Sequence, residues 1–234
     1  MELTIKKRFP LLDLIRGIAV IFMIIFHSTF DLKMLKFISH SSLSESYWFY
    51  FPRLIVCMFL FCVGASLSIT HKNKFKLAAF SKRLLLIGFW AIIISIATYI
   101  LFPKYWIKFG MLHIVATSSL LSIPFIKRPF ISLFVSIIIL LLFFIIIPNK
   151  ITFPPEEWAP NSFDYIPIYP WFSAVLLGIF WEHLGFFKIK ISVHSRKLKF
   201  IQFLGRHSLL IYILHQPFLY GTLYAALYIL TLIK

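Results

Sequence analysis

The chain has 234 residues, of which 60% are hydrophobic and only 14% are charged. A soluble domain carries about 25% charged residues, and the mean hydropathy here is +0.90. These values exclude an ordinary soluble fold. They predict a single all-α, polytopic membrane domain that takes in residues 1–234.

Seven apolar segments approach the length of about 20 residues that a helix needs to cross a bilayer. We therefore expect a membrane helix bundle of about seven transmembrane helices, joined by short loops. In chain order the segments are residues 11–30, 49–69, 84–101, 110–126, 130–147, 170–187 and 205–232.

The basic residues are spread unevenly over the loops between these segments. The formal net charge is +16, and 16 of the 24 Lys and Arg residues fall on the side of the N-terminus. Six fall on the other side, while Arg16 and Arg53 lie within helices. This asymmetry predicts a protein of the cytoplasmic membrane with its N-terminus inside and, for seven spans, its C-terminus outside. The basic loops are expected to face anionic lipid headgroups of the bilayer and not nucleic acid.

Four ionisable side chains fall along the first helix, namely Asp13, Arg16, His27 and Asp31. At about 100° per residue, Arg16 and His27 lie about 20° apart, and the two aspartates lie about 60° to either side. Because charges in lipid are costly, this shared face should point to other helices or to a water-filled cavity. His27 and Asp31 are four residues apart, so the carboxylate can orient the imidazole as a general base. The plainer alternative is an anchoring pair at one end and a separate interfacial His–Asp pair at the other.

Three more polar residues within the apolar segments are candidates, each with a structural alternative. His215 lies in the last segment beside Gln216 and Pro217, and proline interrupts helical hydrogen bonding. His113 opens the fourth segment and could equally be a packing histidine. Arg53 opens the second segment and could simply extend to the membrane interface.

The inner ends of the last two segments carry a further polar cluster. Arg206 and His207 begin the last segment, and Glu182 and His183 lie near the end of the one before it. The cluster indicates either a site for an anionic ligand or an ordinary interfacial charge network.

The longest outer loop, residues 149–168, contains Asp164 and leads to Trp171. It is a candidate lid or acceptor-recognition segment. Its prolines and aromatic residues also suit an interfacial belt. No spacing of His, Cys, Asp and Glu typical of a metal site occurs in the chain, so no metal is expected.

Five groups of residues follow one another along the chain: Leu12-Asp13-Leu14-Ile15-Arg16-Gly17-Ile18-Ala19 with His27, Phe61-Cys62-Val63-Gly64-Ala65-Ser66, Phe109-Gly110-Met111-Leu112-His113, Tyr169-Pro170-Trp171-Phe172, and Leu204-Gly205-Arg206-His207-Ser208-Leu209-Leu210-Ile211-Tyr212 with His215-Gln216-Pro217. Their order and spacing resemble those of small prokaryotic membrane proteins related to heparan-alpha-glucosaminide N-acetyltransferase. The resemblance covers nearly the whole chain and identifies it as a transmembrane acyltransferase.

The resemblance implies that an acyl group, commonly acetyl, passes from cytoplasmic acyl-CoA or acetyl-CoA to a hydroxyl or amine outside. The acceptor is commonly a sugar or glycan. Acyl-CoA is a substrate here, and no permanently bound cofactor is implied. An Arg and a His eleven residues apart are required in related enzymes that O-acetylate surface polysaccharides, which implicates Arg16 and His27. In the heparan enzyme an Asn replaces this His, and the catalytic His comes from the following loop, where this chain has His40.

We therefore expect His27 to be the base, with His40 as the second candidate. His27 would either take the proton of the acceptor or first carry the acyl group itself, and both routes stay open. The expected catalytic residues are His27, Asp31, His215, His113 and His40. The expected acyl-CoA-binding residues are Arg16, Arg206, His207 and Ser208, and the expected acceptor-binding residues are Arg53, Asp164 and Trp171.

Two other classes of protein fit the same intramembrane residues. A transporter or flippase would use His, Arg and Asp as a proton relay or an anion site. A non-catalytic subunit of an envelope complex would tolerate substitution of these residues. Self-association into a homo-oligomer is compatible with all three readings.

Overall fold

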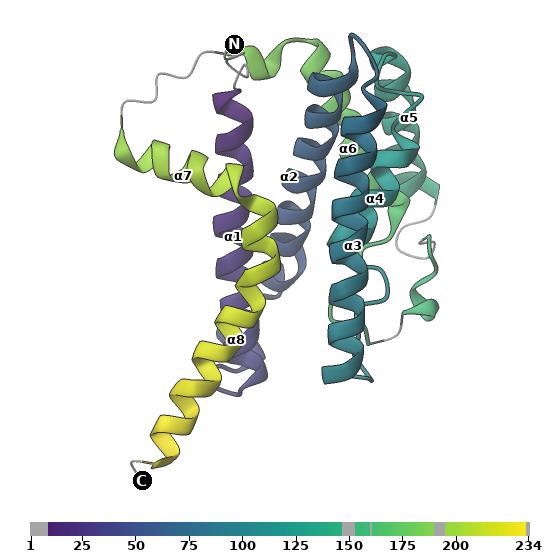
Figure 1. The fold of residues 1–234 in the computed structure, drawn as a ribbon. Coiled ribbons are helices and arrows are strands. Elements are labelled where there is room, and N and C mark those ends of the chain that lie inside the picture. The colour runs from purple at the N-terminus through teal and green to yellow at the C-terminus, as the bar shows by residue number, and fades with distance from the viewer. Residues whose placement is uncertain (1–8, 147–152, 160, 190–194, 233–234) are drawn as a thin grey trace. The chain divides into compact units, whose positions relative to one another are not determined.

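The computed structural model describes residues 9–146, 153–159, 161–189 and 195–232. Within these ranges the regular elements are helical, and two isolated β-bridges add no sheet (Figure 1). The α-helices of these ranges are α1 (Pro10–Met34), α2 (Glu45–His71), α3 (Leu77–Leu101), α4 (Met111–Leu121), α5 (Pro129–Leu141), α6 (Ile168–His183), α7 (Arg196–Arg206) and α8 (Ser208–Leu232).

The all-α class expected from the composition is confirmed. Helices α1, α2 and α3, with 25, 27 and 25 residues, are each long and apolar enough to cross a membrane. The apolar helices α4 and α5 are shorter, and α5 continues into a π-helical turn, Leu142–Ile146. The total of seven spans stays a prediction.

The last predicted segment differs from the observed helices. A break at His207 separates α7 from α8, and most of α7 occupies residues that hydropathy assigns to a basic loop. Basic and apolar residues alternate in α7, so it is amphipathic and escapes a search for uniformly apolar segments. Its first turn is capped by Ser195, whose Oγ accepts a hydrogen bond of 3.2 Å from the Lys197 N–H.

The chain divides into two compact units, and the boundary falls inside α2. The first unit consists of Met1–Met58 and Phe187–Lys234, and the second of Phe59–Phe186. The expectation of a single domain stays a prediction.

In the first unit α7 crosses α1, and the two helices approach at two glycines (Figure 1). A Cβ atom on Gly17 would lie 2.0 Å from the backbone oxygen of Ile201, and one on Gly205 would lie 1.9 Å from that of Asp13. Only residues without a side chain fit at this distance, as is common where membrane helices pack closely. From this crossing α8 starts along α1, which brings polar residues of the two helices together.

In the second unit, α6 and the second part of α2 also approach closely at two glycines. A Cβ atom on Gly64 would lie 1.9 Å from the Val175 oxygen, and one on Gly178 would lie 2.1 Å from the Phe61 oxygen. On α5, Ser132 donates a hydrogen bond of 2.8 Å to a carbonyl group of α6. Apolar packing between helices gains little in lipid, so small residues and hydrogen bonds of this kind hold such helices together.

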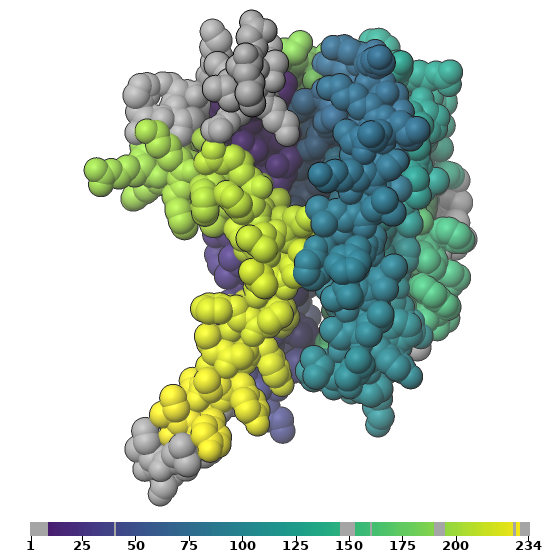
Figure 2. All heavy atoms as spheres, in the orientation of Figure 1, coloured from purple at the N-terminus to yellow at the C-terminus, as the bar shows by residue number. Residues whose placement is uncertain are grey.

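Helix α3 carries a continuous exposed apolar surface. Leu85, Ile92, Ile96 and Ile100 are all exposed, and the side chains of this helix cover much of one face of the second unit (Figure 2). A surface of this kind on a helix of 25 residues is suited to contact with lipid chains.

Candidate functional site

Two histidines meet where α8 runs along α1. The ring centroids of His27 and His215 are 4.8 Å apart, with an angle of 64° between the rings. Nδ1 of His215 lies 2.6 Å from the backbone oxygen of Tyr212. A carbonyl group only accepts hydrogen bonds, so Nδ1 carries the hydrogen and Nε2 of neutral His215 presents a lone pair. The α1–α8 contact thus holds an imidazole with one nitrogen already set as a proton acceptor.

Asp31 is hydrogen-bonded to α8, and its pairing with His27 stays a prediction. Its Oδ1 accepts a hydrogen bond of 2.8 Å from Nε2 of Gln216, and the side chain of Asp31 is only 1% exposed. Residues four apart on a helix can meet, but at this position the carboxylate turns to the nearby amide of α8. Gln216 is not among the site residues predicted from the sequence, although a glutamine within an apolar helix is a recognisable signal.

Three buried polar atoms at this contact have no hydrogen-bond partner in the part of the chain that the structure describes. They are Oδ2 of Asp31, Nε2 of His215 and Oε1 of Gln216. For an ionised carboxylate and a neutral imidazole, all three atoms are acceptors. Buried acceptors without donors are costly. The contact is therefore chemically suited to a ligand that donates several hydrogen bonds.

Aromatic residues surround the histidines on the side of the first part of α2. The ring of Phe26 lies 5.6 Å from that of His27 and 6.4 Å from that of Phe51. Tyr47 stacks on Phe51 at 5.0 Å, and its hydroxyl is 2.7 Å from Oγ1 of Thr29. This apolar wall lowers the local dielectric, which strengthens any electrostatic interaction beside the histidines.

The four residues expected to bind acyl-CoA gather at the other end of α1. Arg206, His207 and Ser208 directly follow Gly205, which packs against the turn of α1 that carries Asp13 and Arg16. Arg206 and His207 are exposed there. Nη1 of Arg16 lies 3.5 Å from Oδ1 of Asp13, so part of its charge is already compensated.

His113 belongs to the second unit, and both of its ring nitrogens have partners. Nδ1 accepts a hydrogen bond of 3.2 Å from the Gly110 N–H, so the neutral ring carries its hydrogen on Nε2. Nε2 then donates to Oγ of Ser95 at 3.2 Å, and Ser95 donates to the oxygen of Ile107 at 2.6 Å. No lone pair of this ring remains for a proton, and the arrangement indicates a structural role.

The residues expected to bind the acceptor lie in two different units, and two of them, Asp164 and Arg53, make local contacts. In the second unit Asp164 caps α4, because its Oδ2 accepts a hydrogen bond of 2.9 Å from the Met111 N–H. Trp171 lies in the first turns of α6, partly exposed. In the first unit the exposed Arg53 lies over the ring of Phe49, 3.5 Å from its centroid. His40 begins a short 3₁₀ helix, and its side chain lies outside the described residues.

A buried ion pair lies in the second unit, between the end of α6 and the residue that follows α2. Glu182 is 2% exposed and accepts hydrogen bonds from Nζ of Lys72 at 2.7 Å and from Oγ of Ser68 at 2.6 Å. Nδ1 of His183 donates to the Ile179 oxygen at 3.0 Å. For Glu182 and His183, the geometry supports the charge-network alternative, since the carboxylate is already satisfied.

Comparison with known proteins relates the chain to one family. Residues 8–217 match the family model described as the catalytic part of heparan-alpha-glucosaminide N-acetyltransferase. None of the curated proteins matches the chain, and none of the solved structures does.

Proposed function

Because the chain belongs to the family of the heparan-alpha-glucosaminide N-acetyltransferase catalytic domain, we propose that it is a membrane acetyltransferase. It takes an acetyl group from cytoplasmic acetyl-CoA and transfers it across the membrane. The acceptor is a group of an amino sugar or a related glycan on the other side. The observation that carries this proposal is the His27–His215 pair at the α1–α8 contact, with three buried acceptor atoms beside it.

The donor enters at the end of α1 where α7 crosses it. Arg16 and Arg206 bind the phosphates of acetyl-CoA, a role that the planar fork of arginine serves well. From Arg16 to His27 the helix rises by about 16 Å, a distance that an extended pantetheine arm can cover. The thioester of acetyl-CoA then reaches the histidines, while the nucleotide of acetyl-CoA stays near the basic end of the first unit.

The acceptor is an amine in preference to a hydroxyl. A protonated amine offers three hydrogen-bond donors, and Asp31, His215 and Gln216 offer three acceptor atoms without partners in the described chain. A hydroxyl offers a single donor and would leave most of these atoms unpaired, which is costly in a buried site. Asp31 also supplies the negative charge that an ammonium group needs when it leaves water.

The proton path follows from the tautomer of His215. Nε2 takes one proton from the ammonium, which makes the amine nucleophilic. The amine nitrogen forms a bond to the thioester carbon, the carbon–sulfur bond breaks, and CoA departs as a thiolate. The second proton of the attacking nitrogen passes to this thiolate, so the products are an acetamide and CoA. Two imidazoles at this distance do not both carry charge readily, so the pair holds a single proton. His27 shares this proton with His215.

The test is transfer of labelled acetyl by the purified full chain in proteoliposomes. Acetyl-CoA carrying a ¹³C-acetyl group is supplied with glucosamine or, as the matched hydroxyl acceptor, glucose, and products are identified by mass spectrometry. We expect labelled N-acetylglucosamine and little labelled glucose ester. A transporter would move one of these compounds without acetylating it, and that result would overturn the proposal. Labelled protein in the absence of acceptor would indicate transfer through an acetyl-histidine.

A further inference from the structure

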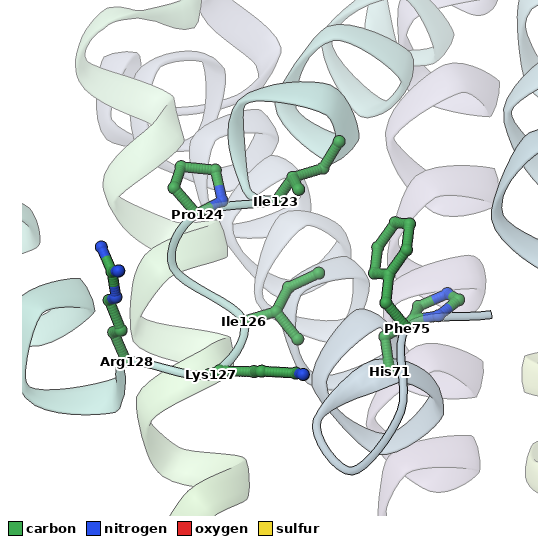
Figure 3. Close-up of a pocket in the computed structure, with 7 residues that line it drawn as sticks. All are labelled: His71, Phe75, Ile123, Pro124, Ile126, Lys127 and Arg128. Atoms are coloured by element: carbon green, nitrogen blue, oxygen red, sulfur yellow. The ribbon is translucent and has the colours of Figure 1, made fainter. Parts of the chain in front are cut away.

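A pocket lies at one end of the second unit, between the chain that follows α2 and the connection from α4 to α5 (Figure 3). Its volume is about 290 Å³. Its apolar walls come from Phe75, Pro124 and Ile126, and its polar residues are His71, Lys127 and Arg128. None of the residues that the acetyl-transfer proposal uses takes part in it.

The charge around this pocket is entirely basic among the residues that line it. Lys127 extends toward His71 and Phe75 (Figure 3), and Lys76 and Arg83 are near enough to act on the ring of His71 through their charges. Lys72, one residue after His71, provides a contrast, because its charge is compensated by Glu182 at 2.7 Å. A concave site that is lined by several positive charges focuses their electric field and so attracts an anion.

His71 supplies a donor of fixed position to this pocket. It is 2% exposed, and its Nδ1 accepts a hydrogen bond of 3.2 Å from the Lys76 N–H. Because Nδ1 accepts, the neutral ring carries its hydrogen on Nε2. The ring therefore keeps an N–H donor in both of its protonation states, as an anion site requires.

We propose that this pocket binds a phosphate ester group, held by Lys127 and His71 with Arg128 at the rim. Phosphate oxygens accept strong charge-assisted hydrogen bonds from such groups. The volume lies just below the range of about 300–1,000 Å³ for pockets that enclose drug-sized ligands, so it takes a headgroup and not a whole nucleotide cofactor. The phosphate belongs either to an anionic phospholipid, whose chains would continue along the apolar helices, or to a small soluble molecule. The pocket lies on the side that the charge asymmetry predicts to be cytoplasmic, where anionic lipids concentrate.

The experiment has two arms that use the full-length protein in detergent. In the first, phosphatidylglycerol and phosphatidylcholine are titrated separately and bound lipid is counted by native mass spectrometry. In the second, inorganic phosphate is titrated by calorimetry. Each arm compares the wild type with Lys127→Gln, Lys127→Arg and Lys82→Gln. Lys82 is an exposed lysine of the nearby first turns of α3 that does not line the pocket, so its substitution makes the same change in net charge.

Loss of one charge-assisted contact should weaken binding about tenfold in Lys127→Gln, while Lys127→Arg restores it and Lys82→Gln changes it less than about twofold. Saturation in the first arm, with preference for phosphatidylglycerol, identifies a lipid headgroup, and saturation in the second identifies a soluble phosphate. The proposal is overturned if neither probe saturates in the wild type. It is equally overturned if Lys82→Gln weakens binding as much as Lys127→Gln, because the pocket would then add nothing to general attraction. Both results leave the acetyl-transfer proposal untouched, since that is read from product formation.

Discussion

His27 and His215 are the two side chains on which the proposed proton transfer depends. We expect His27→Gln and His215→Gln each to lower the rate of acetyl transfer by about 10²–10⁴-fold. If the two rings hold one proton between them, the double variant should lose no more than the worse single variant, because residues that act as a unit are not additive. Initial rates from the proteoliposome assay, set out as a double-mutant cycle, measure this coupling.

A third histidine provides the control for this cycle. Both ring nitrogens of His113 are occupied by Gly110 and Ser95. Its substitution by Ala should therefore lower the thermal midpoint of unfolding, and the rate at low temperature should stay near that of the wild type. Full activity in both His27→Gln and His215→Gln would refute the assignment. The next residue to substitute would then be His40, the alternative that the family resemblance supplies.

For the buried pair of Glu182 and Lys72, the expected loss in the free energy of unfolding depends on which partner is substituted. Lys72→Met leaves a carboxylate that is 2% exposed without its cation, and breaking a buried pair in this way costs about 3–5 kcal/mol. Glu182→Gln should cost less, because the side chain of Lys72 is 23% exposed and can turn toward water. Unfolding by denaturing detergent, followed by circular dichroism, gives both free energies. The opposite order would show that Glu182 is not held as an ionised partner.

At the scale of helices, the crossing of α7 over α1 depends on the absence of side chains at two positions. Gly205→Ala would place a Cβ atom 1.9 Å from the backbone oxygen of Asp13, so the two helices must separate. We expect a loss of about 1–3 kcal/mol from overpacking, together with weaker binding of acetyl-CoA, since Arg206 moves with α7. The thermal midpoint and the dissociation constant of CoA measure the two effects.

The matched control for this crossing is Gly221→Ala in α8. Apart from its chain neighbours and the backbone of α8 itself, no atom of the described residues lies within 4 Å of the position that its Cβ would take. The substitution should therefore leave CoA binding unchanged. It should also raise stability slightly, by about 0.5–1 kcal/mol, because alanine favours the helix. Equal losses in Gly205→Ala and Gly221→Ala would mean that the crossing has no special importance.

At the scale of the whole molecule, the uneven distribution of basic residues predicts a topology. With 16 Lys and Arg on one side and 6 on the other, the N-terminus is expected in the cytoplasm. If there are seven spans, reporter proteins fused after Lys234 and inserted in the 72–76 loop should report opposite sides of the membrane. Reports from the same side would mean an even number of spans, with α4 or the α5 region as the first candidate for a helix that does not cross.

Hydropathy and helical period, read from the sequence alone, were sufficient for the all-α membrane class and for placing Arg16 and His27 on one face of the first helix. Both depend on local properties: the length of apolar segments and the angle between successive residues. The motifs also placed the chain in the acyltransferase family that the family match over residues 8–217 confirms. Hydropathy did not predict the amphipathic α7, because the stability of this helix comes from packing on α1 and not from its own hydropathy.

The tertiary structure alone decided which partners the polar residues take. Asp31 could be paired with His27 from their spacing, but the amide of Gln216, 185 residues further along the chain, accounts for its hydrogen bond. His113 and His215 look equivalent in the sequence. The structure separates them, because the ring of His113 is bonded to Gly110 and to Ser95 of α3, while Nε2 of His215 has no hydrogen-bond partner among the described residues. Spacing along one helix determines which residues share a face, but the bond that each side chain makes depends on distances between helices, and these are set by close contacts such as those at Gly17 and Gly205.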